Sequence, residues 1–353
     1  MNHLKKIAEK LPEYGLDAML ITSESGEFYA VGFHGEGVVL VTKEKCWYAT
    51  DSRYIEAAGA IEGVELLQLS AAKSYRQMVA ELVSERGIKC LGFEEERMSV
   101  REYTAWTEEV PAQFLPASEL LTELRMVKDE EELAAMAEAQ RITDEAFTEI
   151  LDFIKPGLTE SEVAARLTYI MARKGAMRNS FDPIVACGAN GSKPHAIPGS
   201  SVISAGQFVT MDFGCVVGGY CSDMTRTVAV GEPSEEMRLV YDTVLKAQKA
   251  GIAKAKAGVT GREVHMAAAD VIAAAGYGDY FGHGFGHSLG VEIHEDPRFS
   301  PAWDKPIPAG ATLSAEPGIY LPGRFGVRIE DVVVLREGGC TDITNSPKEL
   351  IIL

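Results

Sequence analysis

The chain has no long hydrophobic run and comparatively little positive charge. No apolar stretch approaches the roughly 20 residues that a membrane-spanning helix needs, and the first residues lack the continuous hydrophobic segment of a signal peptide. The 353 residues include 34 Lys and Arg against 52 Asp and Glu, which gives a net charge of −18. This charge would repel a polyanion, so we expect no nucleic acid as a partner, and the lack of an apolar run argues against a membrane.

Cysteine and histidine are also scarce. The six cysteines include no CxxC pair. Their even number permits disulfides, but a chain of this length without an export signal favours free thiols in a reducing cytoplasm. Of the seven histidines, four fall among acidic and glycine-rich motifs: His195, His283, His287 and His294.

The length favours about two domains. Residues 1–122 alternate between strand-like and helix-like stretches, which predicts a small α/β domain. A helix is predicted at Ser74–Gly87, ending at its glycine. Strands are predicted at Asp17–Thr22, Gly37–Thr42, Cys46–Thr50 and Lys89–Glu94.

A domain boundary is predicted near residue 122. Asp129, with Glu132 three residues later, has the pattern of a capping box at the start of a long helix. That helix is expected to stop at Pro156-Gly157. Residues 123–353 are therefore predicted to form the second domain.

The second domain contains a faint internal repeat. KPGLTESEV, at 155–163, matches KAGVTGREV, at 256–264, with an offset of 101 residues. AGQFVTMDFG, at 205–214, matches AGATLSAEPG, at 309–318, with an offset of 104. Chance could produce either match, but the shared order of helix, capping box, helix, strand and carboxylate favours two related halves.

Each half of the repeat predicts a hairpin with two carboxylates. Asp212 and Asp223 flank a Gly-Gly turn, and Glu316 and Glu330 flank a Pro-Gly turn. Residues placed in this way are opposite or diagonal neighbours on one face, about 5 to 8 Å apart. The four carboxylates are therefore expected to converge.

Together with His287, these carboxylates form a hard set of oxygen and nitrogen ligands that suits divalent ions such as Mn, Co or Zn. Two such ions about 3.5–4 Å apart can activate water for amide hydrolysis at neutral pH. The alternative is a salt-bridge network, but the nearby cations Arg226 and Arg328 cannot neutralise four buried anions. Glycines around His283 and His287 disfavour a helix and favour a strand or loop that crosses a cavity.

At these residues the chain resembles the pita-bread metallopeptidases, which include methionine aminopeptidase, Xaa-Pro aminopeptidase and Xaa-Pro dipeptidase (prolidase). The motifs that carry the resemblance are MDFG, SDMTRT, HGFGHSLG, AEPGIY and GVRIED. In the first domain, LITSESGEFYAVGFHG and TDSRY resemble the creatinase/prolidase N-terminal domain. The resemblance implies an α+β protein, with a small α/β creatinase-like domain at 1–122 and a pseudo-twofold pita-bread catalytic domain at 123–353.

The resemblance also implies a role for each ligand. Asp212 would chelate one metal ion, and Asp223 and Glu330 would bridge both ions. His287 and Glu316 would complete the shell of the other ion, and Glu316 would act as the general base.

Further residues would act on the substrate. His294 matches the histidine that stabilises the tetrahedral intermediate, and His195 and His283 match histidines on the proline side, one of which would protonate the leaving group. Arg328 matches an arginine of the proline-specific branch. Phe181 matches an aromatic residue of the substrate pocket, with ordinary core packing as the alternative.

The implied reaction is hydrolysis of the bond before proline in small peptides with proline in second position, using two divalent ions, with Mn favoured. The overall length and short first domain favour a dipeptidase; an Xaa-Pro aminopeptidase acting on longer peptides is the alternative. Methionine aminopeptidase lacks the first domain and fits less well, and a metal-free binding protein would have lost ligands that are all present here. A homodimer in the cytoplasm is expected.

Overall fold

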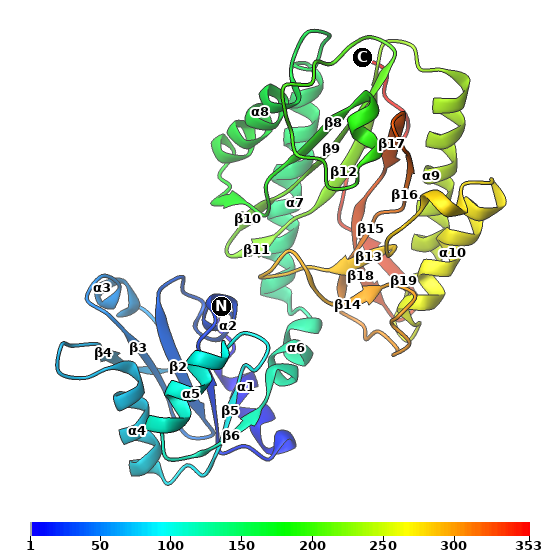
Figure 1. Cartoon of the computed structure of the whole chain (residues 1–353). Helices are drawn as coiled ribbons and strands as arrows, with labels where there is room; N and C mark the ends of the chain where they lie inside the picture. The colour runs from blue at the N-terminus through cyan, green and yellow to red at the C-terminus, as the bar shows by residue number, and fades with distance from the viewer. Residues whose placement is uncertain (1) are drawn as a thin grey trace. The chain divides into compact units, whose positions relative to one another are not determined.

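The computed structural model describes residues 2–353 and divides into two compact units (Figure 1). One unit ends at Arg125 and the other spans Met126–Leu353. The division falls within helix α6 (Ser118–Met126), a few residues after the predicted boundary. Among the helices that the structure describes, none has the length and apolar character to cross a membrane.

The first unit is built on a six-stranded mixed sheet in the order β4-β3-β2-β1-β5-β6. The four predicted strands are confirmed as β1 (Ala18–Ile21), β2 (Gly37–Thr42), β3 (Cys46–Thr50) and β5 (Cys90–Phe93). The sequence does not predict the two edge strands, β4 (Val64–Gln68) and β6 (Gln113–Pro116). Both are only partly buried, so their hydrophobic signal is weak.

The helices of this unit are short. They are α1 (Leu4–Lys10), α2 (Glu24–Val31), α3 (Ile55–Ala58), α4 (Tyr75–Arg86) and α5 (Val100–Glu109), with α6 at the division. The predicted helix is α4: Ser74 and Gln77 form its capping box, and Gly87 ends it in the left-handed conformation at φ 67°. Trp47, Val83 and Leu91 are among the buried residues of the core.

Four helices frame the second unit: α7 (Glu130–Leu151), α8 (Glu160–Arg173), α9 (Glu235–Lys254) and α10 (Gly261–Ala274). In Figure 1, α7 and α8 lie along one side of the strands, and α9 and α10 lie along the other. Asp129 caps α7 through the predicted box with Glu132. The predicted end of this helix at Pro156 is wrong, because α7 ends at Leu151, where Phe153 N–H donates to Ile150 O at 3.0 Å and tightens the last turn.

The strands of the second unit fall into two sets. The first half holds β7 (Arg178–Asn179), β8 (Ile184–Cys187), β9 (Gln207–Phe213), β10 (Cys215–Val217), β11 (Tyr220–Cys221) and β12 (Met224–Val230). The second half holds β13 (Gly286–Ser288), β14 (Glu295–Phe299), β15 (Thr312–Ala315), β16 (Gly318–Leu321), β17 (Phe325–Arg328), β18 (Asp331–Arg336) and β19 (Gly339–Asp342). β13 confirms that the glycine-rich histidine segment is not a helix.

The internal repeat is present in the fold. Both predicted capping boxes form, at Thr159 for α8 and at Thr260 for α10. Two residues before each cap, a glycine N–H donates to an equivalent carbonyl: Gly157 to Ile203 O at 2.9 Å and Gly258 to Ile307 O at 2.8 Å. The two halves therefore repeat the same path from helix to strand.

The alternation along β9 decides which side chains reach the site. Val209, Met211 and Phe213 are buried in the core with α7 and α8. Successive strand residues point to opposite faces, so Asp212 points away from that core. The apolar alternation of the strand thus places one carboxylate on the inner face.

Candidate metal centre

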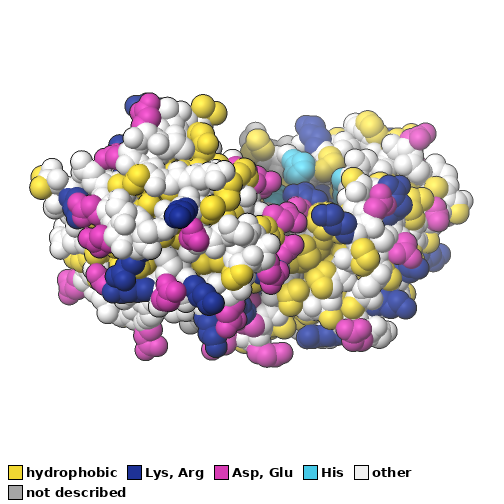
Figure 2. Space-filling view, turned by 90° about the horizontal axis from the view of Figure 1, so that it is seen from below, with side chains coloured by type: hydrophobic (Ala, Val, Ile, Leu, Met, Phe, Trp, Pro, Cys, Tyr) yellow, Lys and Arg dark blue, Asp and Glu magenta, His cyan; other side chains and the backbone are white. Residues whose placement is uncertain are grey.

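A cavity of about 910 Å³ lies in the second unit, where the two hairpins meet. In the space-filling view, histidine side chains appear in a hollow of the surface beside basic and acidic groups (Figure 2). The structure brings all the predicted site residues to the lining of this cavity: Phe181, His195, Asp212, Asp223, His283, His287, His294, Glu316, Arg328 and Glu330.

The first hairpin carries Asp212 and Asp223. Asp212 in β9 pairs with Thr225 in β12, and Asp223 lies two residues before Thr225. The two carboxylates are therefore diagonal neighbours on one face, as the sequence predicted. Gly218 and Gly219 both have positive φ, 56° and 85°, which lets the chain turn tightly between the strands.

The second hairpin carries Glu316 and Glu330. Ala315 in β15 pairs with Asp331 in β18, and the register places Glu316 directly opposite Glu330. The Glu330 N–H donates to Thr225 O of the first hairpin at 3.0 Å. This hydrogen bond joins the two halves at the site.

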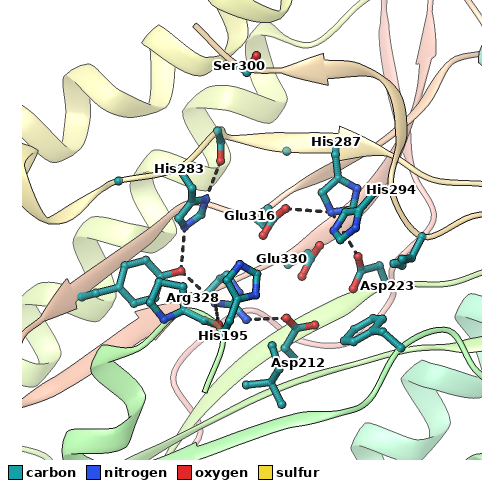
Figure 3. A pocket seen from close by; sticks show the side chains of 18 of the residues that line it. His195, Asp212, Asp223, His283, His287, His294, Ser300, Glu316, Arg328 and Glu330 are labelled. Atoms are coloured by element: carbon teal, nitrogen blue, oxygen red, sulfur yellow. Dashed lines mark hydrogen bonds and ion pairs between the residues drawn. The ribbon is translucent and has the colours of Figure 1, made fainter. Parts of the chain in front are cut away.

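His287 faces three of the carboxylates (Figure 3). Its Nε2 lies 3.3 Å from Glu316 Oε1 and 3.7 Å from Asp223 Oδ2. Ligand atoms of Asp223, His287 and Glu330 all lie within 4.8 Å of one another. His287 Nδ1 donates to Ser288 O at 3.1 Å, which leaves Nε2 as the nitrogen available to a metal ion.

Two ligand oxygens are buried without a protein partner. Asp212 Oδ2 accepts from Arg328 Nη2 at 2.6 Å, but among residues 2–353 neither Asp212 Oδ1 nor Glu330 Oε1 has a hydrogen-bond partner. Burying an anionic oxygen without a partner is costly, and divalent cations bound by these carboxylates would give each oxygen a partner. The donor set therefore fits divalent metal ions.

The pKa values respond to the same crowding of charge. Burial, and then the neighbouring carboxylates, raise the pKa of Asp223 and Glu330 well above the usual range. Burial also raises the pKa of Asp212, although Arg328 opposes this. Burial alone would raise the pKa of Glu316 and lower that of His287, but their mutual hydrogen bond and the neighbouring charges together outweigh it and bring these pKa values to about 2 and about 9. In the metal-free site, bound protons therefore neutralise the negative charge that divalent cations would otherwise neutralise.

His283 belongs to a hydrogen-bonded chain at one end of the cavity. Its Nδ1 donates to Gly284 O at 2.8 Å, so its Nε2 accepts from Tyr320 Oη at 2.9 Å. Arg328 Nη1 donates to the same Tyr320 oxygen at 3.0 Å. Burial lowers the pKa of His283, which keeps the imidazole neutral at pH 7.

The other two histidines lie on different segments. The His294 ring packs edge-on against His287, with 4.5 Å between ring centroids, and burial lowers its pKa. His195 lies in the loop after β8, and the carbonyl of the preceding Pro194 accepts from Arg328 Nη1 at 3.2 Å. The loop is thereby tied to the carboxylate site.

Tyr320 and Arg298 also line the cavity, and the sequence analysis does not identify them. Tyr320 lies four residues after Glu316 along the hairpin. Residues an even number apart on a strand share a face, so the sequence could have placed Tyr320 beside Glu316. Arg298 pairs with His287 across β13 and β14, where the register shifts at a bulge. A register that shifts in this way gives no signal in the sequence.

Comparison with known proteins identifies both units. Residues 134–337 match the model of metallopeptidase family M24, and residues 3–127 match the creatinase/prolidase N-terminal domain. A solved structure of an Xaa-Pro dipeptidase from Bacillus anthracis has a TM-score of 0.95 and 43% identity, covering 99% of each chain.

Two further relatives are named for different activities, one as an aminopeptidase and one as a dipeptidase. The solved structure of an X-Pro aminopeptidase from Thermotoga maritima MSB8 has a TM-score of 0.92 and 36% identity, covering 98% of this chain and 100% of that one. An Xaa-Pro dipeptidase from Pyrococcus horikoshii is 33% identical over 99% of this chain and 98% of its own. The expected α+β architecture of a creatinase-like domain followed by a pita-bread domain is confirmed, and methionine aminopeptidase is not favoured. The chain therefore belongs to metallopeptidase family M24 and carries a creatinase/prolidase N-terminal domain.

Proposed function

We propose that this metallopeptidase hydrolyses the peptide bond between an N-terminal residue and proline, with two divalent ions held by Asp212, Asp223, His287, Glu316 and Glu330. The observation that carries the proposal is the convergence of four carboxylates and one imidazole on one cavity, with two buried oxygens that have no partner among residues 2–353. The names of the similar proteins, which act on Xaa-Pro substrates, support the choice of substrate.

The divalent ions and the side chains would have different roles in the hydrolysis. Bound divalent ions would polarise the scissile carbonyl and lower the pKa of a water molecule. Glu316, whose Oε1 accepts from Ser314 Oγ at 3.1 Å, takes up the proton of the attacking water. His294 donates to the oxygen on which negative charge develops.

The proline side of the substrate lies towards His195 and His283. The neutral His283, held by Tyr320 and thereby by Arg328, orients the substrate. One of the two histidines relays to the leaving imino nitrogen the proton that Glu316 takes from the water molecule, so the protons balance. Phe181 offers an apolar wall for the substrate.

A dipeptidase needs a group that binds or walls off the free carboxylate after proline, and a cationic side chain can bind it. Arg298 lines the cavity and has a half-exposed side chain, with Nε donating to Asp296 Oδ1 at 3.1 Å. A guanidinium can bind a carboxylate through two parallel hydrogen bonds. Arg298 therefore supports a dipeptidase over an aminopeptidase that acts on longer peptides.

The metal identity, assembly and compartment belong to the same proposal. We propose Mn as the metal, because a carboxylate-rich set with one imidazole is compatible with it. All six cysteines, which lie within the described residues, are free, and this fits a reducing cytoplasm. The homodimer rests on the family resemblance.

The test compares substrates of different length. Metal-free protein is reconstituted with Mn²⁺ and assayed on Ala-Pro, Ala-Pro-Ala and, as a control without proline, Ala-Ala. We expect cleavage of Ala-Pro to dominate. Preferred cleavage of Ala-Pro-Ala would make the protein an aminopeptidase, and cleavage of Ala-Ala alone would overturn the proline specificity.

A further inference from the structure

A hydrogen-bonded chain joins two of the ligand carboxylates across the halves of the repeat. Thr225 Oγ1 donates to Glu330 Oε2 at 2.6 Å and accepts from Arg328 Nε at 3.0 Å. Arg328 Nη2 then donates to Asp212 Oδ2 at 2.6 Å. In each carboxylate one oxygen is held by this chain, and the other is the buried oxygen that has no partner within the described part of the protein.

The direction of the Thr225 hydrogen bonds is fixed by chemistry. A guanidinium can only donate, so the Thr225 hydroxyl must accept from Arg328, and its single proton goes to Glu330. Thr225 is fully buried, so water cannot take the place of either partner. The hydroxyl therefore selects Oε2 of Glu330 and leaves Oε1 for the cavity.

Thr225 also holds the backbone of Glu330. Glu330 lies in the short break between β17 and β18, and its N–H donates to Thr225 O at 3.0 Å. One residue thus fixes both the position of the Glu330 backbone and the rotation of its carboxylate.

We propose that Thr225 is a positioning residue that turns the Glu330 carboxylate so that Oε1 faces the metal site, and that it thereby sets the affinity of the site for divalent ions. The proposal rests on the proposed function, because it takes Glu330 as a metal ligand. Without the hydroxyl, Oε2 loses its donor and the carboxylate is free to rotate.

Thr227 provides a matched control on the same strand. It lies two residues along the same face of β12 and is also buried. Its hydroxyl donates to Arg328 O at 3.0 Å and lies 3.0 Å from Thr210 Oγ1. It makes no hydrogen bond to a ligand carboxylate, so removing it takes away a buried hydroxyl but leaves Glu330 held.

The experiment measures metal affinity without substrate. Metal-free wild type, Thr225→Val, Thr225→Ser and Thr227→Val are titrated with Mn²⁺ by calorimetry against a competing chelator. Loss of a residue that orients a metal ligand typically weakens binding about 10- to 100-fold, and we expect this for Thr225→Val. Thr225→Ser, which keeps the hydroxyl, and Thr227→Val should both bind Mn²⁺ like the wild type.

The outcomes separate the two proposals. Two tight sites in the wild type with unchanged affinity in Thr225→Val would overturn the role of Thr225 and leave the proposed function standing. Equal losses in Thr225→Val and Thr227→Val would also overturn it, because any buried hydroxyl would then matter equally. A wild type that binds no Mn²⁺ would overturn both proposals. Thermal melting of the metal-free proteins checks folding, and Thr225→Ala replaces the valine variant if that variant does not fold.

Discussion

The charges of individual residues at the site do not balance without protons or metal ions. Among the residues that the structure describes, two cationic side chains contact the four carboxylates: Arg328 contacts Asp212, and the protonated His287 contacts Glu316. Arg226 does not contribute, because its guanidinium binds Asp331 at 2.7 Å and backbone carbonyls. The excess of negative charge is the physical reason for a divalent pair.

This imbalance predicts opposite pH dependences for the metal-free and metal-loaded protein. Raised pKa values at Asp223 and Glu330, and a pKa of about 9 at His287, mean that the folded metal-free state holds protons that the unfolded state releases. The contribution of these three groups to stability is therefore greatest below their unfolded pKa values and is lost as the pH rises through the folded ones. The lowered pKa of Glu316 has the opposite effect on stability: its contribution is lost as the pH falls, but only below its ordinary pKa of 4.5.

Divalent ions compete with these same protons, so metal binding strengthens as the pH rises. We predict that the difference in Tm between Mn-loaded and metal-free protein increases between about pH 6 and about pH 8.5. Differential scanning calorimetry of both forms at matched ionic strength measures this difference. A difference that stays constant or shrinks with rising pH would contradict the assignment of these groups to a metal site.

At the scale of elements, a helix or strand can be predicted from the sequence when the residues that determine it are neighbours in the sequence. Helices with capping boxes, such as those that begin after Thr159 and Thr260, and strands in continuous apolar runs are set by neighbouring residues, so the sequence predicts them. The edge strands β4 and β6 depend on pairing partners distant in sequence. The same holds for Arg298, whose approach to the cavity depends on a bulged pairing.

Glu160 shows how one element positions another. This buried first residue of α8 holds the loop that carries His195. Its Oε1 accepts from Cys187 N at 2.8 Å and Asn190 Nδ2 at 3.0 Å, and its Oε2 accepts from Gly199 N at 3.1 Å. Both ends of the loop are therefore fastened to one carboxylate.

Replacing this acceptor by an amide should loosen the loop. Glu160→Gln leaves at least one donor without a partner, which costs about 1–3 kcal/mol of unfolding free energy. We expect kcat/KM on Ala-Pro to fall while the number of bound Mn²⁺ ions stays the same, as measured by kinetics, urea unfolding and metal analysis. Glu162→Gln in the same helix is the control, because glutamine also completes a capping box. Identical behaviour of the two variants would rule out the role of Glu160.

At the scale of the whole molecule, the repeat supplies the scaffold but only part of the site. Each half of the second unit has its own buried core, one with α7 and α8 and one with α9 and α10. Cys187 pairs with Val209 as Ser288 pairs with Leu313, so the counterpart of His287 in the first half is Ala186. The carboxylates could therefore be predicted from the symmetry, whereas the imidazole comes from one half alone.

The most direct test of the dinuclear proposal is hydrolysis of Ala-Pro by the metal-free enzyme during stepwise addition of Mn²⁺, with bound metal measured in parallel. Turnover should be absent without metal and should rise until two ions are bound per chain. Glu316→Gln, which removes the proton acceptor, should stay inactive throughout the titration. Turnover in excess chelator, or full activity with a single bound ion, would contradict a dinuclear Xaa-Pro peptidase.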